Sequence, residues 1–314
     1  MVEQKIIDEI QKVCFEKQTF DGSIDSYNDL EALRIKLVST IDNPYKSLVE
    51  MSLMTWGNEG EKWNKLSPQS RLYAVKEVLE NRALPLAKES IKFNFYIDGV
   101  TRHCFDQIAR ARIGVVFSSM GTKDNNVSGS KFIVPYIFNE TDKQKVEEQY
   151  RSSIELYNEL RSTYPGWAAR YVLPEGVMHH FFMSIDYSSL QGFCSNRMET
   201  TEQTDTVAVA WKLREVVKSK FPLLANYLRP ACDFVKRDRT VAVNGFADIL
   251  GIPHSSDNRW NSDADKKYRI WWNYPCTDIK YLIKQGVEVV QSNEWIDYSW
   301  DNLSESDKKL LSEE

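Results

Sequence analysis

The sequence predicts an α+β fold in which helices flank a sheet. Segments 90–97 and 177–186 alternate apolar and polar residues, which is the period-two pattern of half-buried strands. Segments 140–163 and 204–220 instead carry apolar residues at steps of three or four, which is typical of amphipathic helices. The chain has 314 residues, 42% of them hydrophobic and 27% charged, so it can bury the core of one large domain or two modest ones.

The N-terminal residues predict a helical extension over 1–45. Two groups of apolar residues follow helical spacing there: Ile6, Ile7, Ile10 and Val13, then Leu30, Leu33 and Leu37. A further helix is predicted to begin at Ser67-Pro68, because proline suits the first helical position. Its predicted buried side consists of Leu72, Val75 and Leu79.

Residues 46–238 are predicted to form the core domain. Its predicted elements are a strand over 90–97 ending at Asp98-Gly99, a helix to about Arg112, strands over 113–117 and 132–137 around a polar loop, the helix over 140–163, the strand over 177–186, and helices over 187–196 and 204–220. Residues 239–314 differ in character. They contain five of the nine tryptophans (residues 260, 271, 272, 295 and 300), and Gly251, Pro253 and Pro275 interrupt them. We predict an aromatic, loop-rich C-terminal appendage whose charged end, 304–314, frays.

Composition excludes several classes of protein. A net charge of -5 argues against a binder of duplex nucleic acid, which usually carries a clustered basic face. The five cysteines are widely spaced without a C-x-x-C pair, which fits a reduced compartment better than a disulfide framework. No apolar run approaches membrane-spanning length, and the first residues lack the basic start of a signal peptide. We therefore expect a cytoplasmic protein without a membrane partner.

One glutamine and several arginines are candidates for binding an anionic ligand. On the predicted helix, Gln107 and Arg110 share a face, while Arg112 turns away. Arg170 and Arg197 each adjoin apolar residues, where a charged group needs a partner. The planar, permanently charged guanidinium suits phosphate and carbonyl oxygens. These residues predict a nucleotide-like ligand.

The same residues also have structural interpretations. Arg102, Asp106 and Arg110 are spaced as ordinary surface ion pairs, and Arg170 and Arg197 could each form a salt bridge with one of the 45 acidic residues. The polar turn Ser118, Ser119, Gly121 and Lys123 could bind phosphate or be a flexible turn.

Metal and nucleophile chemistry are not predicted. His179 and His180 are adjacent on a predicted strand, so their side chains point to opposite faces and cannot bind one ion together. No spacing of acidic or cysteine residues completes a ligand set with them, so no metal site is expected. The cysteines have no partnered base in the sequence, which argues against a cysteine nucleophile.

Three motifs carry a family resemblance. They are Thr101-Arg102, Gln107 and Arg110-Ala111-Arg112 in order, then Ala169-Arg170-Tyr171-Val172-Leu173-Pro174, with Met54-Thr55-Trp56-Gly57 upstream. With these motifs the chain resembles the flavin-dependent thymidylate synthases (the ThyX family) from about residue 50 to about 235. The resemblance implies a mixed sheet flanked by helices and a homotetramer with sites between subunits, Arg110 and Arg170 coming from different chains.

The resemblance also implies chemistry at C5 of a pyrimidine deoxynucleotide, dUMP to dTMP or a close variant, with FAD as cofactor and NADPH and methylenetetrahydrofolate as co-substrates. It assigns the nucleotide to Gln107, Arg110, Arg170 and Arg197, with Ser119 and Lys123 at the phosphate segment. Arg197 is the implied catalytic residue, at the carbonyl oxygens of the pyrimidine. The implied cofactor contacts are Thr55, Arg110, Arg112, Ile113 and Asp186.

The departures from the family pattern are concentrated at the flavin and phosphate positions. Ala111 replaces the middle histidine of Arg-His-Arg, Leu84 replaces an upstream histidine, and Met120 and Thr122 replace a Ser-x-Arg segment. The family's polar flavin contacts fall on Asp186, Ser188 and Gly192. These differences leave alternatives open: a non-catalytic paralogue that binds a nucleotide or a protein partner, or an enzyme with another nucleotide substrate or a hydroxymethylating activity.

Overall fold

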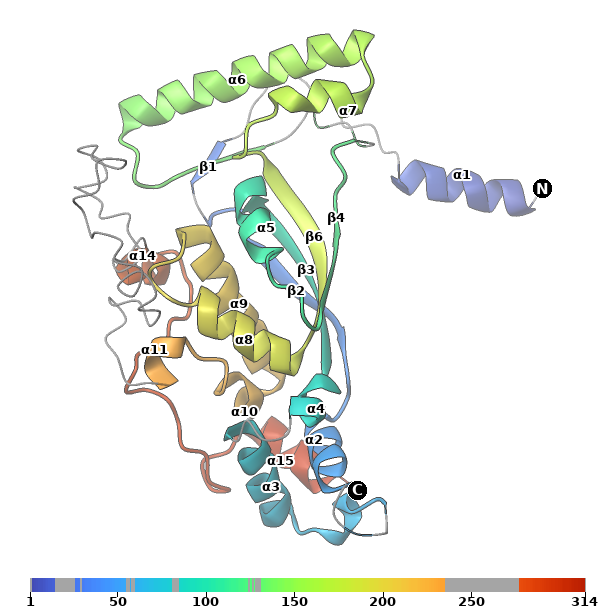
Figure 1. The fold of residues 1–314 in the computed structure, drawn as a ribbon, viewed down its shortest axis with the longest axis vertical. Helices are drawn as coiled ribbons and strands as arrows, with labels where there is room; N and C mark the ends of the chain where they lie inside the picture. The colour runs from blue at the N-terminus through green and yellow to red at the C-terminus, as the bar shows by residue number, and fades with distance from the viewer. Residues whose placement is uncertain are drawn as a thin grey trace, which may run out of the picture. The chain divides into compact units, whose positions relative to one another are not determined.

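The computed structural model describes residues 2–14, 26–28, 30–54, 57, 60–80, 85–123, 125, 127, 131–234 and 277–313. The chain divides into two compact units. The first contains Met1–Ala32, Gly99–His103 and Ser119–His180, and the second contains Leu33–Asp98, Cys104–Ser118 and Phe181–Glu314. Figure 1 traces the chain through both of them. Within the described residues, no helix has the length and apolar character needed to cross a membrane.

The second unit is built on a four-stranded antiparallel sheet in the order β2-β3-β6-β4. The strands are β2 (Arg34–Thr40), β3 (Lys92–Thr101), β6 (Met178–Asp186) and β4 (Val115–Ser119). β2 and β3 pair from Arg34 opposite Asp98 to Thr40 opposite Phe93, with an irregularity after Leu37. Phe93, Phe95 and Ile97 are fully buried, and the residues between them are partly exposed. This is the alternation that predicted a strand here.

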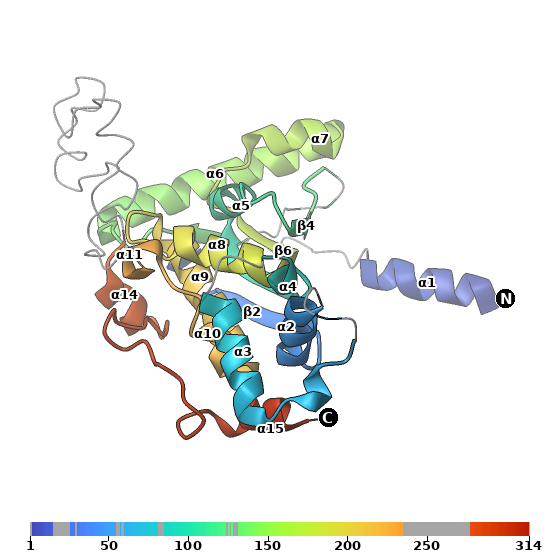
Figure 2. The ribbon, with the colours of Figure 1, turned by 60° about the horizontal axis from the view of Figure 1, so that its bottom comes forward.

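Helices α8 (Tyr187–Arg197) and α9 (Thr204–Lys220) pack against each other beside this sheet, as both Figures 1 and 2 show. α9 also packs on β2, and its residues from Val207 to Trp211 are all completely buried. A helix that is buried on nearly all sides lies inside a core, so α9 is the central helix of this unit. α8 begins at Asp186, whose carboxylate caps the helix by accepting a hydrogen bond from the Ser189 N–H.

The other helices of the second unit surround this centre. They are α2 (Pro44–Leu53), η1 (Trp63–Lys65), α3 (Pro68–Glu80), α4 (Pro85–Glu89), α10 (Pro222–Ala225), α11 (Ala231–Phe234), α14 (Ile279–Lys284) and α15 (Glu305–Ser312), while α5 (Arg102–Ile108) begins in the first unit and ends in the second. Leu72, Val75 and Leu79 of α3 are buried, which confirms the predicted helix start and its buried side.

The first unit contains α1 (Val2–Cys14), β1 (Ser26–Asn28), β5 (Phe132–Val134), α6 (Glu140–Thr163), α7 (Gly166–Ala169) and η2 (Arg170–Val172). β1 and β5 form a two-stranded parallel sheet. Ile154 and Tyr157 are the buried residues of α6, and Tyr150 stacks on Phe132 with 4.4 Å between ring centroids. The predicted helix over 140–163 is therefore confirmed, together with part of its predicted buried stripe.

The C-terminal residues are more ordered than predicted. α15 packs on α2 and α3, with Asp307 and Leu311 completely buried. The Asp307 carboxylate accepts hydrogen bonds from the Tyr45 hydroxyl and from the Leu223 N–H. The prediction that residues 304–314 fray is therefore wrong, because Leu311 and the satisfied Asp307 fix the helix on the core. Trp260, Trp271 and Trp272 lie outside the described residues.

Three predicted boundaries are also wrong. Leu30, Leu33 and Leu37 do not lie on a helix, because residues 34–40 form β2, where pairing with β3 overrides their helical spacing. The strand predicted to end at Asp98-Gly99 continues to Thr101, since Gly99 adopts a φ of 75° inside it. α5 ends at Ile108 rather than near Arg112. The predicted helix over 204–220 is confirmed, and the predicted domain boundaries at 45 and 238 stay predictions.

Candidate functional site

Arg197 lies at the end of α8 and contacts α5. Its Nη1 is 2.5 Å from Glu202 Oε2, and its Nη2 donates to the backbone carbonyl of Gln107 at 3.2 Å. Only 17% of the Arg197 side chain is exposed. The structure thus brings together two of the predicted nucleotide residues and also forms the predicted alternative, a structural salt bridge. A guanidinium has five N–H donors, so these two bonds leave donors for a ligand.

The second unit contains three buried cysteines. Cys104, Cys194 and Cys232 are buried and form no disulfide bond among the described residues. Burial raises the pKa of the Cys104 and Cys194 thiols, so both stay protonated at neutral pH. The absence of a cysteine nucleophile that the sequence predicts therefore has a physical basis for these two residues.

A cavity of about 310 Å³ in the first unit contains Arg170. We call it the Arg170 cavity, and its lining residues are Arg102, Met120, Thr122, Arg170, Tyr171, Leu173, Pro174, Glu175, Val177 and His179. Arg170 is exposed, and its Nη1 lies 3.5 Å from Thr122 Oγ1, which is the long limit of a hydrogen bond. Two arginines against one glutamate give the lining a positive charge that suits an anion.

His179 is the buried titratable group of the Arg170 cavity, with 2% of its surface exposed. Burial lowers the pKa of His179 from 6.5 to about 4, and electrostatic interactions with Arg102 and His180 act in the same direction. The ring is therefore neutral at pH 7. Within the described residues, no group of three or more His, Cys, Asp or Glu side chains could hold a metal ion.

The predicted phosphate segment lies partly at the Arg170 cavity. Met120 and Thr122 line it, whereas Ser119 and Lys123 are exposed and do not contribute to its lining. The turn is packed against α7, because a Cβ at Gly166 would come within 2.6 Å of the Lys123 carbonyl oxygen. This contact argues against the alternative of a freely flexible turn.

Arg110 and Arg112 follow the end of α5 and are exposed. The prediction that Gln107 and Arg110 share one helix face is therefore wrong, since the helix ends before Arg110. Ile113 is 88% exposed, and it lines a second cavity of about 450 Å³ together with Asp186.

Asp186 is fixed in this second cavity, which we call the Asp186 cavity. Its carboxylate caps α8 and lies 3.3 Å from Lys92 Nζ. Gly114 packs directly against it, because a Cβ there would come within 1.9 Å of Asp186 Oδ2. Gly114 also has a φ of 65°, so glycine is required on both grounds. Asp186, Ile113 and Gly114 thus come together, as the predicted cofactor contacts Asp186 and Ile113 require.

A third cavity, of about 470 Å³, lies along α8 in the second unit. We call it the α8 cavity, and its lining residues are Leu79, Glu80, Lys88, Ser188, Gln191, Gly192, Ser195, Asn196 and Phe234. Ser188 and Gly192 are two of the positions that the family resemblance relates to flavin. A Cβ at Gly192 would meet nothing within 4 Å, so this face of α8 is open.

Sequence reasoning missed several residues of the α8 cavity. Glu80, Lys88 and Phe234 come from three other helices, and no spacing along the chain relates them to α8. One pattern could have predicted a solvent-exposed face of α8. Its polar residues are spaced three and four apart: Ser188, Gln191 and Ser195. Thr55 and Leu84 lie outside the described residues.

Comparison with known proteins assigns this chain, with its α+β fold and arginine-lined cavity, to a family. The family model described as thymidylate synthase complementing protein (Thy1) matches residues 36–223, which is more than half of the chain. The chain belongs to the thymidylate synthase complementing protein family.

Individual relatives are distant. A flavin-dependent thymidylate synthase of Sulfurisphaera tokodaii is 25% identical over 205 residues, covering 64% of this chain and 79% of that protein. One from Saccharolobus solfataricus is 30% identical over 143 residues, covering 45% and 55%. The crystal structure of the UMP/dUMP methylase PolB from Streptomyces cacaoi bound with 5-Br dUMP has the same fold, with a TM-score of 0.54, 16% identity, and coverage of 69% of this chain and 99% of that one.

Proposed function

We propose that this protein transfers a one-carbon unit to C5 of a pyrimidine deoxynucleotide, converting dUMP to dTMP or a close variant. The observation that carries the proposal is the Arg197 guanidinium, which Glu202 and the Gln107 carbonyl hold in one orientation inside the family-matched segment. A fixed planar set of N–H donors suits the adjacent carbonyl oxygens of a uracil ring. The relatives named flavin-dependent thymidylate synthase support the same substrate class.

The proposed nucleotide contacts are Gln107, Arg110, Arg170 and Arg197, with Ser119 and Lys123 near the phosphate. Substitution at C5 breaks the C5–H bond, forms a carbon–carbon bond to the one-carbon unit, and places negative charge on the ring carbonyl oxygens during the reaction. Arg197 is the proposed catalytic residue because its donors would stabilise that charge. Prior orientation by Glu202 reduces the entropy lost when the ligand binds.

The proposed cofactor is FAD, with methylenetetrahydrofolate and NADPH as co-substrates. When bound, the flavin would supply the hydride that reduces the transferred carbon to a methyl group. The described residues fit such a group: the open backbone at Gly192 admits a planar ring, and the hydroxyl and amide groups of Ser188 and Gln191 suit its polar edge. Thr55, Arg110, Arg112, Ile113 and Asp186 stay proposed contacts.

Tritium release tests the reaction directly. The protein is incubated with FAD, NADPH, methylenetetrahydrofolate and dUMP that carries tritium at C5, and label appearing in water reports loss of the C5 hydrogen. We expect release with dUMP, and a large loss of release in Arg197→Lys, which cannot present a planar fork. Chromatography of the nucleotide product separates methylation from hydroxymethylation, and parallel reactions with UMP and dCMP identify an altered substrate. Binding of dUMP without any release would contradict the proposal and favour the non-catalytic paralogue.

We also propose that the protein is a homotetramer whose sites lie between subunits. The open face of the sheet in the second unit supports association with further copies, because it carries exposed apolar side chains: Val38 at 51%, Val116 at 68% and Phe182 at 48%. Phe182 packs beside Tyr96, with ring centroids 5.1 Å apart. A contiguous exposed apolar face typically marks an interface. Light scattering at micromolar concentration should give four times the chain mass, and a monomer would contradict this part of the proposal.

A further inference from the structure

One wall of the α8 cavity comes from outside the family-matched segment. Phe234 is the last residue of α11, and it lines the cavity eleven residues beyond the end of the match at 223. Phe234 is 44% exposed, and polar residues of α8 line the same cavity. An aromatic ring beside hydroxyl and amide groups is the usual composition of a site for a planar, hydrogen-bonding ligand.

The position of Phe234 is fixed by the C-terminal segment. The carboxylate of the neighbouring Asp233 accepts hydrogen bonds from Trp295 Nε1 at 2.6 Å and from Ser292 Oγ at 3.0 Å. The Trp295 ring lies nearly parallel to that of Trp211, 6.4 Å between centroids, and the Arg229 guanidinium lies 4.7 Å from its centroid. Trp295 is thereby held on the central helix α9, and it in turn holds α11.

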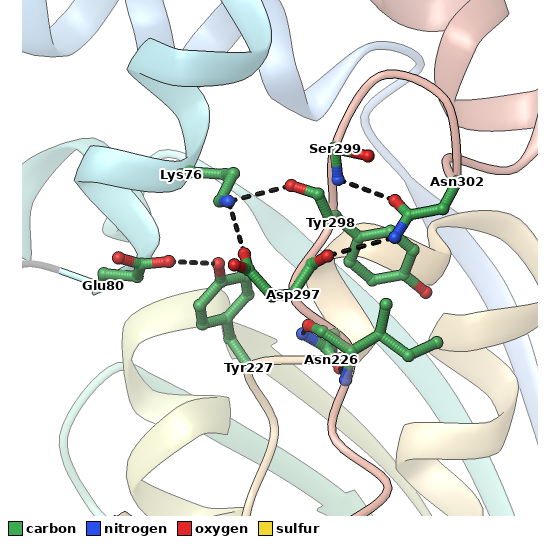
Figure 3. A network of polar contacts seen from close by, with 9 residues as sticks. Lys76, Glu80, Asn226, Tyr227, Asp297, Tyr298, Ser299 and Asn302 are labelled. Atoms are coloured by element: carbon green, nitrogen blue, oxygen red, sulfur yellow. Dashed lines mark hydrogen bonds and ion pairs between the residues drawn. The ribbon is translucent and has the colours of Figure 1, made fainter.

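Residues 292–298 also contact α3, the helix that contributes Glu80 to the lining of the α8 cavity. Figure 3 shows Lys76 of α3 donating to the Asp297 carboxylate at 2.7 Å and to the Tyr298 carbonyl at 2.8 Å. One turn further along α3, Glu80 lines the cavity and accepts a hydrogen bond from the Tyr227 hydroxyl at 2.8 Å. Residues 292–298 therefore connect α11 with α3 across the second unit.

We propose that Phe234 stacks on a planar ring of the flavin in the α8 cavity, and that residues 292–298 position it. This inference rests on the proposed function. The chain lacks polar side chains at two positions where the family has them, Ala111 and Gly192, and the open space at Gly192 leaves room for a ring to reach Phe234. The C-terminal appendage is then part of the cofactor site. Phe234 is a cofactor-contacting residue, and Asp233 and Trp295 are positioning residues.

Equilibrium binding of flavin to the full-length protein tests the proposal, with fluorescence of FAD, FMN and riboflavin as the readout. Phe234→Leu keeps an apolar side chain and removes the aromatic face, so it should weaken binding by about two- to tenfold, the worth of an aromatic stack. Phe234→Trp should retain affinity and quench the fluorescence of the bound flavin, because an indole in contact with the ring donates an electron to the excited flavin. Gly192→Leu places a side chain in the cavity, where a Cβ would meet no protein atom within 4 Å, and should weaken binding at least tenfold.

Matched controls separate contact from folding. Tyr73→Leu changes an exposed aromatic on α3 that does not line the cavity, and should leave flavin binding unchanged. Trp295→Phe keeps an aromatic ring but removes the N–H that donates to Asp233, so it should weaken flavin binding less than Phe234→Leu does. Urea titration of every variant identifies any loss of fold.

The outcomes distinguish this inference from the proposed function. If the wild type binds flavin and folded Phe234→Leu and Phe234→Trp bind and fluoresce as the wild type does, the stacking role of Phe234 is wrong and the proposed function stands. If adenosine monophosphate competes with FAD and Phe234→Leu weakens that competition while FMN binding is unchanged, Phe234 stacks on the adenine ring, and the proposed stacking on the flavin ring is wrong. If the wild type binds none of the three flavins, the flavin part of the proposed function fails together with the inference.

Discussion

Arg170 and Arg197 carry the same chemical group into two very different surroundings. Arg197 has 17% of its side chain exposed and is held by Glu202 at 2.5 Å and the Gln107 carbonyl at 3.2 Å. Arg170 is exposed at the edge of its cavity, and Thr122 Oγ1 lies 3.5 Å away. One guanidinium is therefore oriented before any ligand arrives, and the other must lose side-chain entropy when a ligand orders it.

This difference allows effects on protein stability to be separated from effects on ligand binding. Removing a largely buried guanidinium leaves its carboxylate partner without compensation, so stability falls. Removing an exposed, weakly held guanidinium costs little stability, so that any loss of ligand binding reports contact alone. The two arginines thus predict different patterns of stability and affinity.

The largest expected effect is on stability in Arg197→Ala. We expect the free energy of unfolding to fall by about 2–3 kcal/mol, the range for a partly buried charged hydrogen-bond pair. Arg170→Ala should change it by less than about 0.5 kcal/mol. Urea titration measures both, with Arg151→Ala on the exposed side of α6 as the control for loss of an arginine. Equal losses of stability in Arg170→Ala and Arg197→Ala would contradict the expected difference between the two arginines.

The second prediction concerns nucleotide affinity, which should fall when either arginine is removed. Arg170→Ala and Arg197→Ala should each weaken dUMP binding by about 1.5–3 kcal/mol, the worth of a charged hydrogen bond. Neither lysine variant should restore binding, because an ammonium cannot present two donors in one plane. Titration calorimetry with dUMP, dCMP and UMP measures this. A wild-type protein that binds none of the three would leave both arginines with structural roles only.

The pH dependence of stability tests the Arg170 cavity through His179. Its pKa is lowered from 6.5 to about 4, first by burial and then by the charge of Arg102. Above pH 6.5 the ring is neutral in both states, and between pH 6.5 and 4 the unfolded chain binds a proton that the folded chain does not. Stability should therefore fall by about 2 kcal/mol between pH 7 and 5 through this residue.

The comparison of variants isolates that contribution from the carboxylates. His179→Leu should lose the extra pH dependence between pH 7 and 5 in urea titrations, and His103→Gln on the exposed side of α5 is the control variant. A bound anion in the cavity opposes the charge of Arg102, so dUMP should reduce the wild-type pH dependence. If His179→Leu has the same pH profile of stability as the wild type and the control, the buried neutral ring of His179 does not cause the pH dependence.

The fold could be predicted where one periodicity dominated. Phe93, Phe95 and Ile97 alternate with partly exposed residues, and α9 carries apolar residues at steps of three or four, so both elements could be predicted. Residues 34–40 could not, because the helical spacing of Leu30, Leu33 and Leu37 is local whereas the pairing of β2 with β3 is not. The ordering of α15 also depends on distant partners, since Tyr45 and Leu223 satisfy Asp307.

The candidate site could be predicted in composition but not in arrangement. The resemblance selected Gln107 and Arg197, which the structure brings into contact, and Asp186 and Ile113, which share a cavity. It could not select Glu202, because the sequence holds 45 acidic residues and only the fold identifies which one meets Arg197. It also missed Phe234, because the family-matched segment ends at residue 223.

The smallest expected effect comes from Glu202→Gln, which changes the orientation of Arg197 without removing it. Glutamine keeps the size of the side chain and one acceptor oxygen, so the free energy of unfolding should fall by only about 0.5–1.5 kcal/mol. Affinity for dUMP should fall a few-fold, because the guanidinium must then be ordered by the ligand. In the double variant Arg197→Ala, Glu202→Gln, the glutamine should add no further loss, since its partner is already absent. Calorimetry and urea titration of the four proteins in this cycle measure both quantities. Additive losses would mean that the Glu202 side chain stabilises the protein through contacts other than Arg197, and that Arg197 is oriented by α5 alone.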